Sequence, residues 1–82
     1  MNGIKSIRGN YGRTFIELND GSIIVGDSEF RAKSGKVDGV YVYTQSLKYK
    51  ETEVQLTAEE IEELMKEVEI YNKDKRDFIE WV

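Results

Sequence analysis

The chain has 82 residues and a formal net charge of −4, and it contains no cysteine and no histidine. A chain of this length forms one domain, residues 1–82, with a modest hydrophobic core. The missing cysteine excludes disulfides and thiolate metal sites, and the missing histidine removes the commonest general base and zinc ligand.

The sequence also lacks the features of a membrane or exported protein. No apolar stretch approaches the roughly 20 residues that a membrane-spanning helix needs. The first eight residues lack the unbroken apolar run of a signal peptide. We therefore expect a cytoplasmic protein without a membrane partner.

The first half of the sequence predicts short strands separated by turns. Glycines interrupt runs that are rich in β-branched and aromatic residues. Asn19, Asp20 and Gly21 supply the positive-φ turn of a hairpin, and a second turn is expected at residues 34–36. The expected strands lie at residues 3–8, 13–18, 22–25, 28–33 and 40–43, with a less regular continuation through Leu47 and Tyr49.

The second half contains the clearest element, a helix that starts at Thr57. Thr57 and Glu60 match a capping box, and Leu56 with Ile61 matches a hydrophobic staple. Apolar residues recur at helical spacing and end before Asn72. The predicted buried stripe consists of Ile61, Leu64, Met65, Val68 and Tyr71.

The last five residues, 78–82, predict a closing strand in which Trp81 contributes to the core. The expected fold class is therefore α+β. We expect a curled antiparallel sheet of about five or six short strands, with one C-terminal amphipathic helix packed on a face and a final strand after it.

Charge is divided unevenly along the chain. Residues 1–50 carry eight basic and five acidic residues, a balance of +3, whereas residues 51–82 carry four basic and eleven acidic residues, a balance of −7. An acidic total argues against nucleic acid as a partner and favours a basic protein.

The predicted helix places much of this acid on the face opposite its apolar stripe. Glu59, Glu63 and Glu67 repeat at i,i+4, where like charges cost a few tenths of a kcal/mol per pair. Glu62, Lys66 and the aliphatic Ile70 share this side of the helix, and Glu62 forms a favourable i,i+4 pair with Lys66. We expect the four carboxylates to steer a basic partner, with Ile70 as an apolar anchor. The alternative is an ordinary solvated face, on which single exposed aliphatic residues are common.

A second candidate surface lies on the predicted sheet. Three tyrosines and three cations could form a basic aromatic face for single-stranded nucleic acid, namely Tyr41, Tyr43, Tyr49, Arg31, Lys48 and Lys50. The alternative, which the negative net charge favours, is that Tyr41 and Tyr43 pack under the helix. A third interpretation is a homodimer sealed by Ile70 or by an unpaired strand edge.

Catalytic and cofactor motifs are absent from the sequence. Serines and lysines do not occur at a spacing that pairs a nucleophile with a base. Residues 9–12 lack the lysine of a P-loop and the third glycine of a dinucleotide fingerprint. We expect no enzymatic activity, no catalytic residue, no metal and no cofactor.

The order of the elements resembles a known family. Short strands surround a polar turn, a leucine and a threonine lead into an acidic helix, and a basic turn precedes a closing strand: Arg13–Leu18, residues 19–21, residues 22–26, Leu56 to Ile61, residues 73–76 and residues 78–82. This layout is similar to that of small bacterial immunity proteins of polymorphic toxin systems, specifically immunity protein family seventy-four. The resemblance implies a cytoplasmic, antitoxin-like protein that blocks a cognate toxin by direct contact. The tryptophan–proline segment that the family tends to carry before the helix is absent here.

Overall fold

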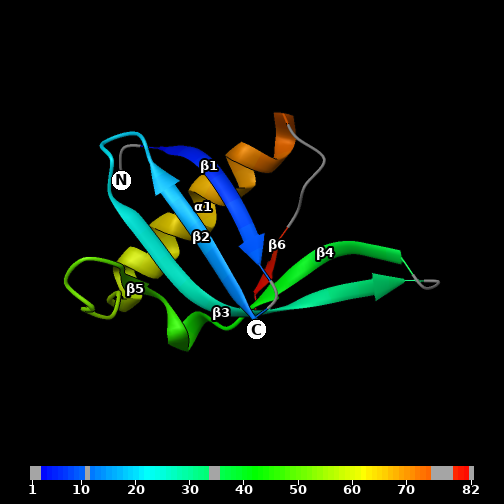
Figure 1. Cartoon of the computed structure of the whole chain (residues 1–82). Coiled ribbons are helices and arrows are strands. Elements are labelled where there is room, and N and C mark those ends of the chain that lie inside the picture. The colour runs from blue at the N-terminus through cyan, green and yellow to red at the C-terminus, as the bar shows by residue number, and fades with distance from the viewer. Residues whose placement is uncertain (1–2, 11, 34–35, 75–78, 82) are drawn as a thin grey trace.

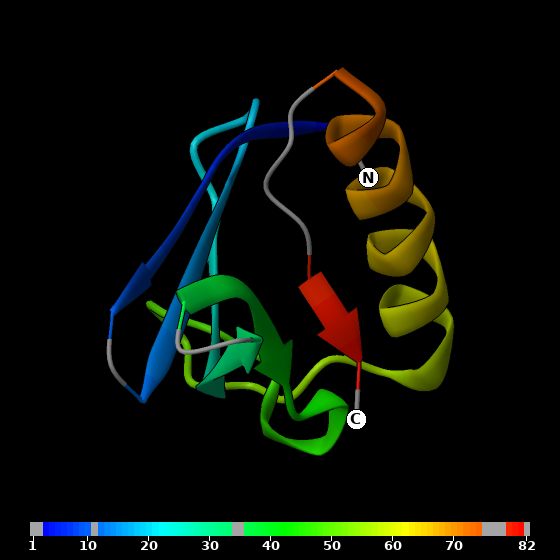
Figure 2. The ribbon, with the colours of Figure 1, turned by 90° about the vertical axis from the view of Figure 1, so that its right-hand side faces the viewer.

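The computed structural model describes residues 3–10, 12–33, 36–74 and 79–81. These residues form one sheet with a single α-helix packed across it, so the predicted α+β class is confirmed (Figures 1 and 2). The elements are β1 (Ile4–Asn10), β2 (Arg13–Leu18), β3 (Ile23–Lys33), β4 (Lys36–Val42), the 3₁₀ turn η1 (Thr44–Ser46), β5 (Lys48–Tyr49), α1 (Ala58–Asp74) and β6 (Ile79–Trp81).

The sheet has the strand order β1-β2-β3-β4-β6, and the short β5 pairs with the first half of β3. The pairs among β1 to β5 are antiparallel, whereas β6 runs parallel to β4. A parallel pair needs a long crossover, and the segment containing α1 provides it between these two strands. The predicted closing strand is thus present over Ile79–Trp81, while Phe78, Val82 and the side chain of Trp81 lie outside the described residues.

The predicted turn between β2 and β3 is confirmed. Gly21 has a φ of 90°, and the amide of Leu18 donates to the carbonyl of Ser22 at 2.8 Å. The carboxylate of Asp20 accepts a hydrogen bond from the amide of Ser22, also at 2.8 Å, which is the local bond that favours Asp in turns. The turn fixes the register in which Ile16 faces Ile24.

The prediction of two separate strands at residues 22–25 and 28–33 is wrong, because β3 runs through both. The first half of β3 pairs with β2, and its second half pairs with β4. The hairpin formed by β3 and β4 extends beyond the part of the sheet that α1 covers (Figure 1). Gly26 lies inside the strand. A Cβ on Gly26 would lie 2.9 Å from Leu47 Cδ2 and 3.3 Å from Val42 Cγ1. The glycine therefore makes room for core side chains and does not end the strand.

The core lies between α1 and the inner face of the sheet. Ile16, Ile24 and Val42 from the strands are fully buried, as are Leu64 and Val68 from the helix. Ile61 packs against the same cluster, so the predicted helical stripe faces the sheet. Burial of this apolar surface is the main contribution that holds the two layers together.

The capping box at the start of α1 is also confirmed. The amide of Glu60 donates to Thr57 Oγ1 at 3.2 Å, and the amide of Thr57 donates to Glu60 Oε1 at 3.0 Å. These reciprocal bonds satisfy two donors that the first turn of a helix leaves open. Leu56, just before the cap, is 7% exposed and belongs to the core.

The contact at Gly26 leads to a testable prediction. Gly26→Ala should lower the free energy of unfolding by about 1–3 kcal/mol, because the new methyl group overlaps side chains in a closely packed core. Urea denaturation of the variant and the wild type measures this difference.

A double-mutant cycle separates this steric cause from any other effect of the substitution. Leu47→Ala alone should cost about 2–5 kcal/mol through the cavity it leaves. In that background Gly26→Ala should cost much less, since the closest overlapping atom is gone. An equal cost in both backgrounds would contradict the steric explanation.

Candidate functional site

The five residues predicted to bind a partner lie along α1. We define the acidic face as Glu59, Glu62, Glu63, Glu67 and Ile70. Four of these side chains are exposed, and Glu67 is half-buried. Ile70 exposes 58% of its surface, so this aliphatic side chain stands in water as the helical periodicity predicts.

Glu67 and Ile70 border a hollow between the helix and the start of β1. The hollow has a volume of about 320 Å³, and its remaining lining consists of Gly3, Ile4, the cation Lys5, Asn19 and Tyr71. A Cβ on Gly3 would lie 3.7 Å from Glu67 Oε2, which places this carboxylate directly beside the backbone there. The acidic face is therefore continuous with a recess that a partner's side chain could enter.

Glu60 has a structural role at the edge of the acidic face. Its carboxylate accepts hydrogen bonds from the hydroxyl of Tyr49, on β5, and from the amide of Thr57. The bond from Tyr49 is the main cause that lowers the pKa of Glu60. The same bond raises the pKa of Tyr49 to about 12, with smaller contributions from burial and from nearby carboxylates. The pair thus holds the first turn of α1 against the sheet.

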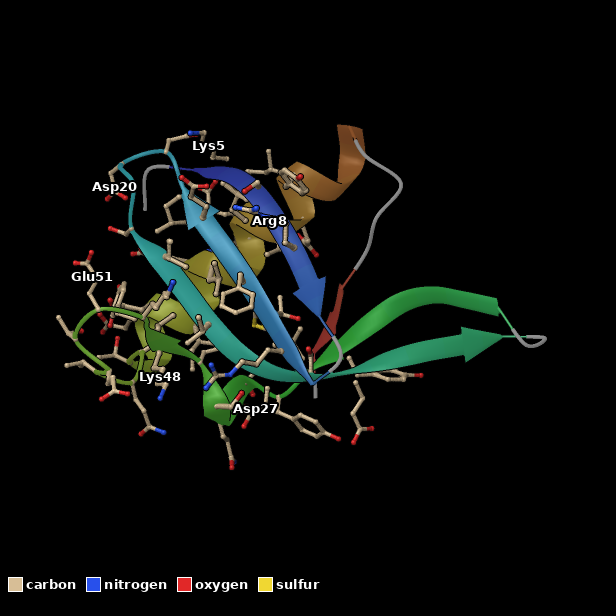
Figure 3. All side chains as sticks on the ribbon, in the orientation of Figure 1. Lys5, Arg8, Asp20, Asp27, Lys48 and Glu51 are labelled. Atoms are coloured by element: carbon tan, nitrogen blue, oxygen red, sulfur yellow. The ribbon has the colours of Figure 1, made fainter. Side chains whose placement is uncertain are left out.

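Acidic side chains outside the helix extend this negative region. The charges of Glu63 and Asp20 both contribute to the raised pKa of Tyr49, which places them near its hydroxyl. Asp20, Tyr49 and Glu51 line a hollow of about 440 Å³. Figure 3 shows Asp20 and Glu51 at the same end of the molecule. Sequence patterns predict Asp20 only as a turn residue, so its place beside the helix carboxylates appears only in the folded chain.

The aromatic surface predicted from the sequence does not form as one patch. Val42 is the fully buried residue at the end of β4, whereas Tyr43 is 37% exposed. The prediction that Tyr41 and Tyr43 pack under the helix is therefore wrong, because strand alternation gives that position to Val42. A hydrogen bond with Glu29 is the main cause that raises the pKa of Tyr43. Tyr49 lies opposite Ile24 on the inner side of the sheet.

Arg31 is also predicted for this aromatic surface, but its side chain is not among those that the structure describes. Among the residues that the structure describes, no group of three or more acidic side chains could hold a metal ion. In the same residues, no helix has the length and apolar character needed to cross a membrane.

No protein family, curated protein or solved structure matches this chain.

The bond between Tyr49 and Glu60 predicts a specific dependence of stability on pH. The folded protein favours the neutral phenol, because folding raises the pKa of Tyr49 from its ordinary value of 10.0 to about 12. Its contribution to stability is complete below about pH 10 and disappears as the pH rises through about 12. Tyr49→Phe should therefore be less stable than the wild type at neutral pH, and the difference should shrink between pH 10 and 12. Thermal melts of both proteins across this range measure it, and a constant difference would contradict the assignment.

Proposed function

We propose that this protein is a non-catalytic protein-binding module that recognises a basic partner protein through the acidic face. The observation that carries the proposal is the position of Ile70. Its side chain is 58% exposed on the same helix surface as the carboxylates, and it borders the recess beside Glu67. An apolar centre surrounded by a polar rim is the usual anatomy of a protein–protein interface.

The arrangement of charge supports the same conclusion. Glu59 and Glu63 are exposed one turn apart, and Glu67 follows one turn later. Such like-charged neighbours destabilise an isolated helix slightly, so helix stability alone does not favour them. A basic partner would convert this repulsion into attraction, and charge complementarity would speed its association.

The resemblance to the immunity proteins suggests what kind of partner this is. A cytoplasmic antitoxin-like protein would use the acidic face to cover a basic surface of its cognate toxin. The capping box that forms part of the resemblance is present. It fixes the first turn of α1, where the acidic face begins. We therefore propose an inhibitor that works by direct contact and carries out no chemistry itself.

Reversal of charge on the acidic face tests the proposal. Glu59→Lys/Glu63→Lys should abolish capture of a basic protein from the native cell lysate. With that protein purified, the variant should associate at least about tenfold more slowly at low salt, because electrostatic steering is reversed. Stopped-flow association kinetics measure the rate.

A matched variant controls for the change in total charge. Glu29→Lys/Glu53→Lys makes the same change at two exposed positions outside α1 and should leave the association rate within about twofold. Equal effects of the two variants would show that only the total charge matters, and the acidic face would then have no specific role.

Ile70 makes a separate prediction, which concerns the lifetime of the complex. Ile70→Ser should change the free energy of unfolding by less than about 0.5 kcal/mol, because the side chain is exposed. Dissociation from the partner should become about tenfold faster if Ile70 is the anchor. Surface plasmon resonance measures dissociation. The competing homodimer predicts instead that light scattering detects a dimer in the wild type and a monomer in Ile70→Ser.

A further inference from the structure

The face of the sheet that is turned away from α1 has the opposite character to the acidic face. Strand registers place Arg8 beside Phe15, Phe15 beside Val25, and Val25 beside Lys48. These four residues form one row across β1, β2, β3 and β5. Ile16 and Ile24, the next residues along β2 and β3, are buried toward the helix, so strand alternation points the row outward. Figure 3 labels Arg8 and Lys48, the two ends of the row.

Two further cations flank the row. Lys50 lies beside Ile23, because its amide donates to the Ile23 carbonyl at 2.9 Å, and its Nζ lies 6.0 Å from the centre of the Phe15 ring. Arg13 opposes Asp27 at the other end of β2. We define the outer sheet face as Arg8, Arg13, Phe15, Lys48 and Lys50.

The outer sheet face is hollowed on both sides of its central row. Arg8, Phe15 and Lys50 line a hollow of about 310 Å³. Arg13 and Lys48 line another, of about 320 Å³, together with the edge of Val25. Each hollow is thus bounded by two cations, and the half-buried phenyl ring of Phe15 lines the first.

The carboxylates on this face do not cancel its charge. Glu17 pairs with Lys5 at 3.7 Å and accepts a hydrogen bond from Ser6 at 3.5 Å. Glu53 pairs with Lys48 at 3.7 Å from a side chain that is 76% exposed, where an ion pair contributes little and is easily exchanged. Asp27 is the remaining acidic residue in the second hollow. The four cations therefore outnumber the carboxylates that line the two hollows.

We propose that the outer sheet face binds a short stretch of single-stranded nucleic acid. Stacking on an aromatic ring and pairing of phosphates with surrounding cations are the two interactions by which sheet surfaces hold single strands. The row spans three strand spacings, or about 14 Å, which suits a few nucleotides. A base would stack on Phe15 in place of the Lys50 ammonium, and the four cations would contact the backbone. The site is independent of the acidic face, which lies on the opposite layer. The carboxylates there would repel the nucleic acid.

The test uses fluorescence anisotropy with labelled eight-nucleotide oligomers of deoxythymidine and uridine at 50 mM salt. Arg8→Gln/Lys50→Gln changes two exposed residues and should weaken binding at least tenfold. The logarithm of the binding constant should fall with the logarithm of salt concentration with a slope of about −2.8 for four phosphate contacts, and about −1.4 for the variant.

Phe15→Leu separates stacking from charge. Leucine still covers Val25 but offers no ring, so binding should weaken at least threefold while the salt slope stays unchanged. The control is Lys66→Gln/Lys73→Gln, which removes two cations from α1 and should leave affinity within twofold. Circular dichroism melts establish that each variant is folded before its affinity is compared.

Three results would overturn the proposal. The first is no binding of either oligomer up to millimolar protein at 50 mM salt. The second is equal weakening by the outer-face variant and the control. The third is equal affinity for a polyglutamate peptide of the same charge. This last result would identify a protein surface as the occupant.

Discussion

The contact between Gly26 and the side chains of Leu47 and Val42 is the constraint on which the rest of the fold depends. Because Gly26 has no Cβ, the side chains of Leu47 and of Ser46 in η1 can lie directly against β3 at this residue. Ser46 then accepts a hydrogen bond from the amide of Asp27 at 2.8 Å, which fixes η1 to the strand. A Cβ at position 26 would lie 2.9 Å from Leu47 Cδ2 and 3.3 Å from Val42 Cγ1, so these two buried side chains would have to shift within a closely packed core.

The position of η1 determines the position of both charged surfaces. Because η1 is held against β3, the residues that follow it pair with β3 as β5. In this register Tyr49 faces inward and Lys48 faces outward. Tyr49 reaches Glu60 and so orients the start of α1, on which the acidic face lies. Lys48 completes the cationic row on the opposite side. The same two-residue strand therefore contributes to both surfaces, and alternation along it separates the two charges.

Local patterns predicted the elements whose physical cause is local. The capping box of Thr57 and Glu60, the helical stripe and the Asp20 turn all depend on residues within four positions of one another. The two strands predicted at residues 22–25 and 28–33 are one strand in the structure, because the role of Gly26 depends on Leu47, which lies 21 positions later in the sequence. Alternation along β4 places Tyr41 and Tyr43 on one face and Val42 on the other, but it does not show which face is buried. The prediction buries the two tyrosines, whereas packing in the structure buries Val42. The smaller Val42 fits there.

The outer sheet face shows why net charge is a weak guide to partners for a two-layered protein. The total of −4 averages an acidic helix layer with a basic outer sheet surface, and a ligand near either surface responds mainly to the nearer charges. At physiological salt the screening length is about 8 Å, which is less than the separation of about 10 Å typical of packed layers. Each surface therefore presents its own sign to solution. Lys50 lies 35 positions after Phe15 in the sequence, and only the pairing of β1, β2 and β3 with the segment after β5 brings it beside Phe15 and Arg8.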